Sequence, residues 1–252
     1  MRNFLLVDIG NSRVKWALKQ ADYLRVGEPI MRGDRKFRFE EAWNSIETPK
    51  RILVSNVLGD EVAQELAQWC LDHWSTSPEF VRPMAVGFGV ENGYLNPARL
   101  GVDRWACLVA ARAIFKDAVC VMDCGTAITV DILDPAGRHQ GGVICPGVEL
   151  MQDALFRGTY ALSREGLAPA ALLGRDTGAG IHSGTLTAAA GLIEKLLNEV
   201  EKVMQCRLRL LLCGGGAQAV GSRLRVSYTG VPDLVLQGLA VIASENDYEE
   251  LN

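Results

Sequence analysis

The sequence predicts an α/β protein built from two similar halves. Apolar runs with strand-like alternation recur between segments that have the period of amphipathic helices. The stretches "LLVDIGNSRVKWAL" at 5–18 and "VCVMDCGTAITVDIL" at 119–133 share one pattern: a strand ends at Asp-x-Gly and a second strand follows. No low-complexity linker divides the 252 residues. A repeated unit of this kind predicts two α/β domains, residues 1–117 and 118–252.

The elements of the first half follow from local patterns. An amphipathic helix is expected over 60–74, where apolar residues recur at helical spacing and Asp60 stands as the N-cap. A loop rich in Gly, Pro and Asn over 83–97 carries Tyr94, and a helix over 98–115 follows. Strands are predicted at 4–8, 13–19, 23–26, 51–57 and 80–82.

The second half repeats the strand–turn–strand opening and then adds helices. A Pro-Gly break precedes the helical segment "PGVELMQDALFRGTYAL", and a loop is expected over 163–175. Two further helices are predicted over 185–204 and 234–244. Strands are predicted at 118–123, 127–133, 142–145 and 208–213.

The composition excludes several classes of protein. A net charge of −4 argues against a nucleic-acid-coating protein, which needs a basic face, although a local basic groove stays open. Seven cysteines without a C-x-x-C pair, and three histidines at no ligand spacing, predict free thiols in a reducing compartment and no zinc site. No secretory leader is evident, and no apolar stretch reaches the roughly 20 residues that span a bilayer. We therefore expect a soluble, cytoplasmic protein.

The two Asp-x-Gly turns have the chemistry of a phosphate site. A carboxylate at the end of a strand, Asp8 or Asp123, suits hydrated Mg²⁺, which prefers oxygen ligands. The following glycine lets backbone N–H groups approach an anion, and the side chains of Asn11, Ser12 and Thr126 are donors for phosphate oxygens. One such turn alone is typical of an ordinary hairpin, whereas two matching copies favour phosphate binding.

The other glycine-rich segments indicate which known types of phosphate-binding motif the chain has or lacks. No G-x-x-x-x-G-K-[ST] motif occurs, and the glycines of 178–184 miss the dinucleotide-binding spacing by one residue, so neither a P-loop nor a Rossmann site is predicted. The stretch "LLLCGGGA" at 210–217 is a strand that runs into three glycines. Such a turn lets a nucleobase or ribose lie against the backbone, or it is a plain strand-to-helix turn.

The stretch "RLGVDRWACLVAARA" places two charged residues near the start of a helix. Asp103 is suited either to the positive end of the helix dipole or to accepting a proton from a substrate hydroxyl during phosphoryl transfer. Arg104 presents a planar fork that pairs well with a substrate carboxylate.

Five segments together resemble the ordered motif series of type III pantothenate kinases. They are "DIGNSRVKWAL", "NGYLNPARLGVDRW", "DCGTAITVDIL", "GGVICPGVELM" and "LLLCGGGA", and their order and spacing match over nearly the whole chain. That family belongs to the acetate and sugar kinase, Hsp70 and actin superfamily. The resemblance implies duplicated ribonuclease-H-like (actin-like ATPase) halves with an ATP cleft between them. It also implies ATP-dependent phosphorylation of pantothenate to 4′-phosphopantothenate, the first step of coenzyme A synthesis.

The resemblance further implies roles for individual residues, a homodimer and three cofactors: ATP, Mg²⁺, and K⁺ or NH₄⁺. Asp103 would be the catalytic base, Asp123 would bind the monovalent cation, and Asp8 would hold Mg²⁺ through water. Asp176 stands where relatives have Asn, and Ser12 where many have Thr. The pantothenate-binding set is Tyr94, Gly101, Val102, Asp103, Arg104 and Thr177. The ATP-binding set is Asp8, Ile9, Gly10, Asn11, Ser12, Arg13, Val14, Lys15, Thr126, Gly214 and Gly215.

Three other functions share the superfamily fold. Another small-molecule kinase would phosphorylate a sugar or an acid, and a regulatory protein would keep the fold without catalysis. The retention of Asp8, Asp103 and Asp123 disfavours a dead site. A ribonuclease-H-type nuclease would use a carboxylate cluster, which the small-residue turns and the acidic composition disfavour. His182 is expected at a helix start or an interface and not in catalysis.

Overall fold

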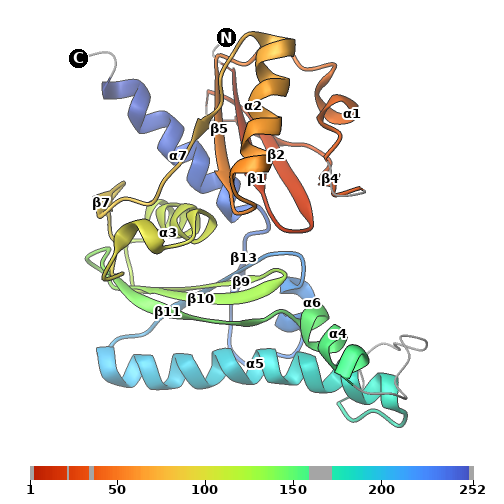
Figure 1. Cartoon of the computed structure of the whole chain (residues 1–252). Helices are drawn as coiled ribbons and strands as arrows, with labels where there is room; N and C mark the ends of the chain where they lie inside the picture. Colours follow the sequence, from red (N-terminus) through yellow and green to blue (C-terminus); the bar gives the residue numbers. More distant parts are fainter. Residues whose placement is uncertain (1–2, 22, 34–36, 159–171, 250–252) are drawn as a thin grey trace. The chain divides into compact units, whose positions relative to one another are not determined.

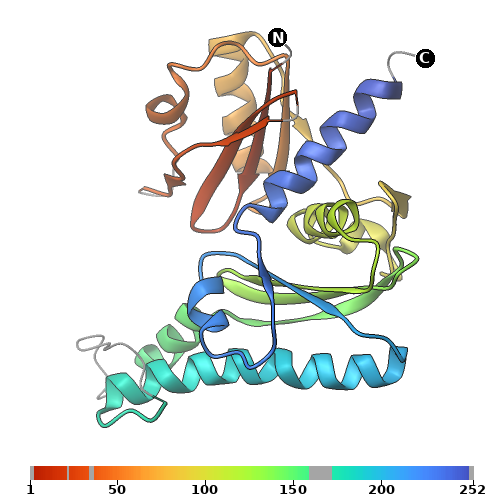
Figure 2. The same ribbon diagram turned by 180° about the vertical axis from the view of Figure 1, so that it is seen from behind.

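A computed structural model describes residues 3–21, 23–33, 37–158 and 172–249 of the chain. The chain forms two compact units, shown from two sides in Figures 1 and 2. The first comprises Met1–Ile114, Gly137–His139 and Leu234–Asn252, and the second comprises Phe115–Ala136 and Gln140–Asp233. The C-terminal segment, from Leu234 on, therefore belongs to the first unit by its contacts. The domain boundary between residues 117 and 118 stays a prediction.

The first unit is built on a mixed sheet with strand order β3-β2-β1-β5-β6, and β4 pairs with β2. The central strand β1 is antiparallel to β2 and parallel to β5. Because β1 is covered on both faces, its sequence "NFLLVDI" is almost continuously apolar and is buried along its length except at Asp8. The strands are β1 (Asn3–Ile9), β2 (Arg13–Gln20), β3 (Tyr23–Val26), β4 (Ile30–Met31), β5 (Arg51–Asn56) and β6 (Glu79–Phe80).

Helices complete the first unit's core. They are α1 (Phe39–Trp43), α2 (Asp60–Trp74), α3 (Val102–Ile114) and α7 (Leu234–Glu249), with a 3₁₀ turn at Pro97–Arg99. α3 packs closely against α7, because a Cβ on Gly238 would lie only 2.0 Å from the backbone oxygen of Ala106. Aromatic side chains of α1 and α2 pack in one core cluster with the buried residues of the sheet. Within this cluster Phe39 is stacked on Trp43, with 5.0 Å between ring centroids.

Two sequence predictions for the first unit need correction. Asp60 is the first helical residue of α2 and not its N-cap, because Gly59 takes that position with a φ of +84°. The carboxylate of Asp60 still benefits from the helix dipole. The predicted loop over 83–97 contains a short hairpin of β7 (Val86–Gly87) and β8 (Val90–Glu91). The glycines of this segment favoured the prediction of a loop.

The second unit repeats the sheet topology of the first. Its strand order is β11-β10-β9-β12-β13, with β9 antiparallel to β10 and parallel to β12. β9, β10 and β12 therefore correspond to β1, β2 and β5, which confirms the predicted duplication. The strands are β9 (Val119–Cys124), β10 (Ala127–Leu133), β11 (His139–Pro146), β12 (Arg209–Cys213) and β13 (Thr229–Gly230).

The helices of the second unit are α4 (Val148–Gly158), α5 (Thr177–Met204) and α6 (Ala217–Gly221). Figure 1 shows α5 running along one face of the β9–β11 sheet. α5 begins eight residues before its predicted start at 185, because Asp176 caps it and the glycines at 178, 180 and 184 lie inside it. The end of the helical segment after the Pro-Gly break and most of the predicted loop at 163–175 lie outside the described residues. Among the helices described, none is both long and apolar enough to cross a membrane.

Candidate active site

The turn between β1 and β2 holds the first predicted carboxylate. The Gly10 N–H donates to the Arg13 carbonyl at 3.0 Å, which closes the turn. Asp8 lies directly opposite Ser55 on the parallel strand β5. Ser55 is fully buried, and its hydroxyl donates a hydrogen bond to Asp8 Oδ1 at 3.1 Å. This hydrogen bond from the neighbouring strand orients the carboxylate of Asp8, which is half-buried.

The rest of this turn divides into exposed and buried residues. Asn11, Ser12 and Arg13 are exposed, so their side chains are accessible to a ligand. Ile9 and Val14 are fully buried, so these two predicted ATP-binding residues offer a ligand only backbone groups. Lys15 is half-buried on β2, directly opposite Asp8 in the antiparallel register.

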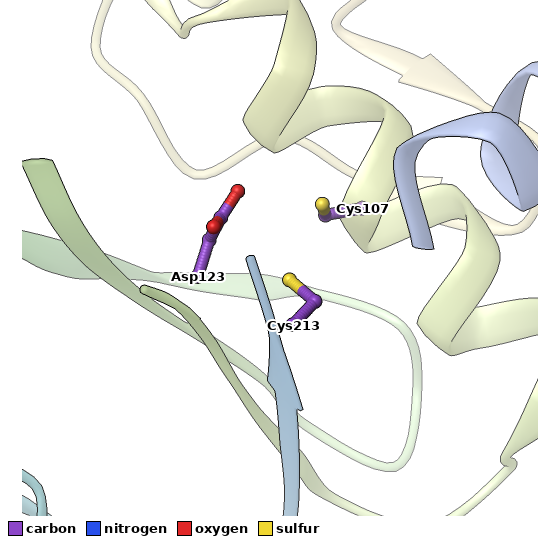
Figure 3. Close-up of side chains that lie close together, drawn as sticks. All are labelled: Cys107, Asp123 and Cys213. Carbon is purple, nitrogen blue, oxygen red and sulfur yellow. The ribbon is translucent and has the colours of Figure 1, made fainter. Parts of the chain in front are cut away.

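The turn between β9 and β10 has the same construction with one residue fewer. The Gly125 N–H donates to the Ala127 carbonyl at 3.1 Å, and the exposed Thr126 forms the tip. Asp123 lies opposite Cys213 of the parallel strand β12, so Cys213 occupies the place that Ser55 has in the first unit. Figure 3 shows these two side chains close together. A carboxylate oxygen of Asp123 and Sγ of Cys213 lie within 4.8 Å of each other.

The glycine run after β12 passes directly over the end of β9. Gly214 has a φ of +85°, and a Cβ there would lie 2.2 Å from Asp123 Oδ1 and 2.6 Å from the carbonyl carbon of Cys124. The Gly216 N–H donates to the Cys124 carbonyl at 2.9 Å, and Gly215 lies exposed between them. Glycine is therefore required at 214 both for the backbone conformation and for the close approach to the carboxylate.

Burial affects the pKa of two thiols near this turn. Burial, with a smaller contribution from the Asp123 carboxylate and then from Cys213 and Cys145, raises the pKa of Cys124 to about 12. Burial likewise raises the pKa of Cys145. Because the thiolate is the reactive form of cysteine, a raised pKa disfavours Cys124 and Cys145 as nucleophiles.

The start of α3 presents the third predicted element. Asp103 lies in the first turn of the helix, and its Oδ1 accepts a hydrogen bond from the Arg104 N–H at 2.8 Å. A Cβ on Gly101 would lie 2.6 Å from Asp103 Oδ1. The glycine therefore leaves the space that the carboxylate occupies, while Val102, the first helical residue, is half-buried.

Arg104 is a buried cation with a defined orientation. Its side chain is only 6% exposed, its guanidinium carbon lies 5.4 Å from the centre of the Tyr94 ring, and its Nη1 donates to the Tyr94 hydroxyl at 2.6 Å. Tyr94 is in turn held by Asn92, whose Oδ1 accepts from the Tyr94 N–H at 3.1 Å. The Asn92 amide also donates to the carbonyls of Met84 and Pro97, each at 3.1 Å, and so ties the loop together.

Thr177 is the exposed first residue of α5. Asp176 caps the helix by accepting from the Ala179 N–H at 2.8 Å, which is the hydrogen bond that an Asn at this position also makes. Ser55 and Asn92 were not among the residues predicted from the sequence. The "ENGY" stretch carries a signal for Asn92, since Asn commonly bonds the backbone two residues on, but nothing local marks Ser55 as the partner of Asp8.

The donor atoms fit the ions expected at a phosphate-transfer site. Asp8 offers carboxylate oxygen beside a hydroxyl, the hard ligands that Mg²⁺ prefers. Asp123 and the exposed backbone around Gly125 likewise offer oxygen ligands, which suit a monovalent cation.

Comparisons with known proteins show which family the chain resembles. Residues 4–199 match the family model described as type III pantothenate kinase. A type III pantothenate kinase of Nitrosococcus oceani is 38% identical over 249 residues, which cover 96% of this chain and 94% of the relative. That of Burkholderia vietnamiensis is 38% identical over 252 residues and covers 96% of both chains.

Solved structures support the fold. A Campylobacter jejuni protein assigned to the Baf family of transcriptional activators superposes with a TM-score of 0.61 at 20% identity, covering 97% of this chain and 99% of that one. A Sinorhizobium meliloti protein assigned as a 2-dehydro-3-deoxygalactonokinase gives a TM-score of 0.56 at 14% identity, covering 96% and 99%. These two likenesses bear on the fold alone, and they agree with the duplicated actin-like ATPase fold expected from the sequence. From the family match and the near-full-length relatives, the chain belongs to the type III pantothenate kinase family.

Proposed function

We propose that the chain phosphorylates pantothenate to 4′-phosphopantothenate with ATP. The observation that carries the proposal is the start of α3, where a half-buried carboxylate and a buried, oriented guanidinium lie on adjacent residues. Pantothenate carries one carboxylate and one primary hydroxyl, which are the partners that Arg104 and Asp103 suit.

Both Asp-x-Gly turns carry groups that suit the phosphates of a nucleotide. The first unit offers Asp8, oriented by Ser55, with the exposed donors Asn11 and Ser12. The second unit offers Thr126 at the tip of its turn, and the glycine run 214–216 gives a nucleobase or ribose a surface free of side chains. Mg²⁺, when bound, offsets the negative charge of the phosphates.

The substrate groups act by orientation and proton transfer. Arg104 pairs with the carboxylate of pantothenate, and Tyr94 holds the guanidinium in place. Asp103 accepts the proton of the primary hydroxyl as its oxygen attacks the terminal phosphorus of ATP, the bond to the bridging oxygen breaks, and ADP leaves. Val102 and Gly101 shape the space beside that carboxylate, and Thr177 contributes a further hydroxyl.

The remaining parts of the proposal concern the cation and the assembly. Asp123 binds K⁺ or NH₄⁺ beside the glycine run, and the protein acts as a cytoplasmic homodimer. Exposed apolar side chains on β11 and α4 support a self-contact: Ile144 is 60% exposed, Leu150 41% and Leu155 42%. The net charge of −4 disfavours a nucleic-acid partner.

Replacement of the catalytic carboxylate tests the mechanism. We expect Asp103→Asn to lower kcat by about 10²-fold or more and to change the KM for pantothenate little, as for the loss of a general base. Asp117→Asn is the matched control, because Asp117 is an exposed carboxylate that pairs with Arg209 at 2.7 Å. An Asp103→Asn enzyme with near-wild-type turnover would remove Asp103 from the role of base.

A further inference from the structure

A short segment from the second half of the sequence belongs to the first unit. Gly137–His139 precedes the main part of β11, and its Gly137 carbonyl accepts from the Glu91 N–H at 2.9 Å. Gly137 has a φ of +86°, and a Cβ there would lie 2.2 Å from the Gly89 carbonyl oxygen. The segment is thus held against the β7–β8 hairpin by its backbone, in a conformation and at a distance that require glycine.

This placement brings a buried imidazole to the predicted substrate loop. His139 is 3% exposed, and its ring lies nearly parallel to the Tyr94 ring, with 5.9 Å between centroids and 16° between planes. Stacking of this kind favours one position of the tyrosine ring. Asn92 fixes the Tyr94 backbone, so the loop and the stack together define where the Tyr94 hydroxyl lies.

The Tyr94 hydroxyl in turn defines the direction of Arg104, which donates to it at 2.6 Å. A guanidinium recognises a carboxylate through donors in a fixed plane, so its orientation decides how well it binds. We propose that His139 is a positioning residue for recognition of the substrate carboxylate, acting through Tyr94 on Arg104. This inference rests on the proposed function and adds to it the residue that sets specificity for an acid substrate.

The test compares two acceptors that differ only at the recognised group. Pantothenol keeps the primary hydroxyl of pantothenate and carries an alcohol in place of the carboxylate. We expect His139→Ala to raise the KM for pantothenate roughly 10-fold, with kcat within about 3-fold of wild type, because an oriented charged contact is weakened. The KM for pantothenol should stay unchanged, so the preference for the acid over the alcohol falls.

Two further variants separate positioning from general stability. His139→Phe keeps an aromatic ring in the stack and should restore most of the preference for pantothenate over pantothenol. This variant also tests the inference if His139→Ala folds poorly. His73→Ala is the matched control, because His73 also stacks on an aromatic ring, Trp69, at 4.1 Å but is exposed on α2. That control should retain the wild-type constants for both acceptors.

The outcomes distinguish this inference from the proposed function. A wild-type enzyme that phosphorylates pantothenate, with an unchanged acid-to-alcohol preference in His139→Ala, would overturn the role of His139 alone. Equal losses for both acceptors in His139→Ala and His139→Phe would do the same. A wild-type chain that transfers no phosphate to pantothenate would overturn the proposed function and this inference with it.

Discussion

The close approach of Gly214 to Asp123 allows a quantitative test of the second turn. A methyl group at position 214 would lie 2.2 Å from Asp123 Oδ1 and 2.7 Å from the Cys124 carbonyl oxygen. Ordinary contacts begin near 3.4 Å, so the carboxylate or the strand end must shift by about 1 Å. A displacement of about 1 Å at a reacting group can cost about 10²-fold in rate, which is the loss in kcat/KM that we expect for Gly214→Ala.

Gly141→Ala is the matched control for this change. Gly141 also has a positive φ, +96°, but nothing lies within 4 Å of its Cβ position. Both variants therefore incur the left-handed conformational cost of about 1–2 kcal/mol, while only Gly214→Ala adds the overlap.

Urea unfolding and steady-state kinetics on the two variants separate these effects. We expect Gly141→Ala to lose stability and keep activity, and Gly214→Ala to lose more stability and most activity. Equal stability losses, with wild-type kcat/KM in Gly214→Ala, would refute the assignment of this backbone to the site.

Three further predictions concern a cap, a thiol and a hydroxyl. Asp176→Ala should lower the free energy of unfolding by about 1 kcal/mol in urea titrations, because it removes the acceptor for the Ala179 N–H, whereas Asp176→Asn should stay near wild type. Burial raises the pKa of Cys70 to about 12 from 9.0, so the folded thiol keeps its proton while the unfolded thiol loses it. The free energy of unfolding should therefore fall as pH rises from about 9 to about 12, less steeply in Cys70→Ala; equal slopes would contradict the burial effect. Ser55→Ala should raise the Mg²⁺ concentration for half-maximal activity about 5-fold, the equivalent of one hydrogen bond to Asp8, and an unchanged Mg²⁺ titration would exclude that role.

Local patterns predicted most of the fold. The bounds of α2, β3 and β10 agree with the sequence prediction, because apolar spacing and turn residues both mark them. The early start of α5 was missed because "GAGIHSG" has the composition of a loop. Its helical state depends on the Asp176 cap and on the packing of Leu186 in a core cluster with residues of β9 and β10, which lie far away in the sequence.

The candidate site likewise contains residues that local motifs reveal and residues whose partners are distant in the sequence. The Asp-x-Gly turns and the start of α3 are local motifs and can be found by inspection of the sequence. Ser55 lies 47 positions from Asp8, and His139 reaches Tyr94 through a segment of the other half of the sequence. Such partners are set by strand register and by the docking of one turn, which a single sequence does not encode locally.

Phosphate transfer to pantothenate by the purified protein is the decisive measurement for the proposed activity. ATP and Mg²⁺ are supplied with K⁺, with NH₄⁺ or with Na⁺ as the sole monovalent cation, and glycerol and N-acetylated sugars serve as alternative acceptors. We expect 4′-phosphopantothenate and ADP in equal amounts, formed faster with K⁺ or NH₄⁺ than with Na⁺, and little transfer to the other acceptors. Absence of phosphorylated pantothenate under all three conditions would contradict the proposed function, and product from another acceptor alone would assign the chain to a different small-molecule kinase activity.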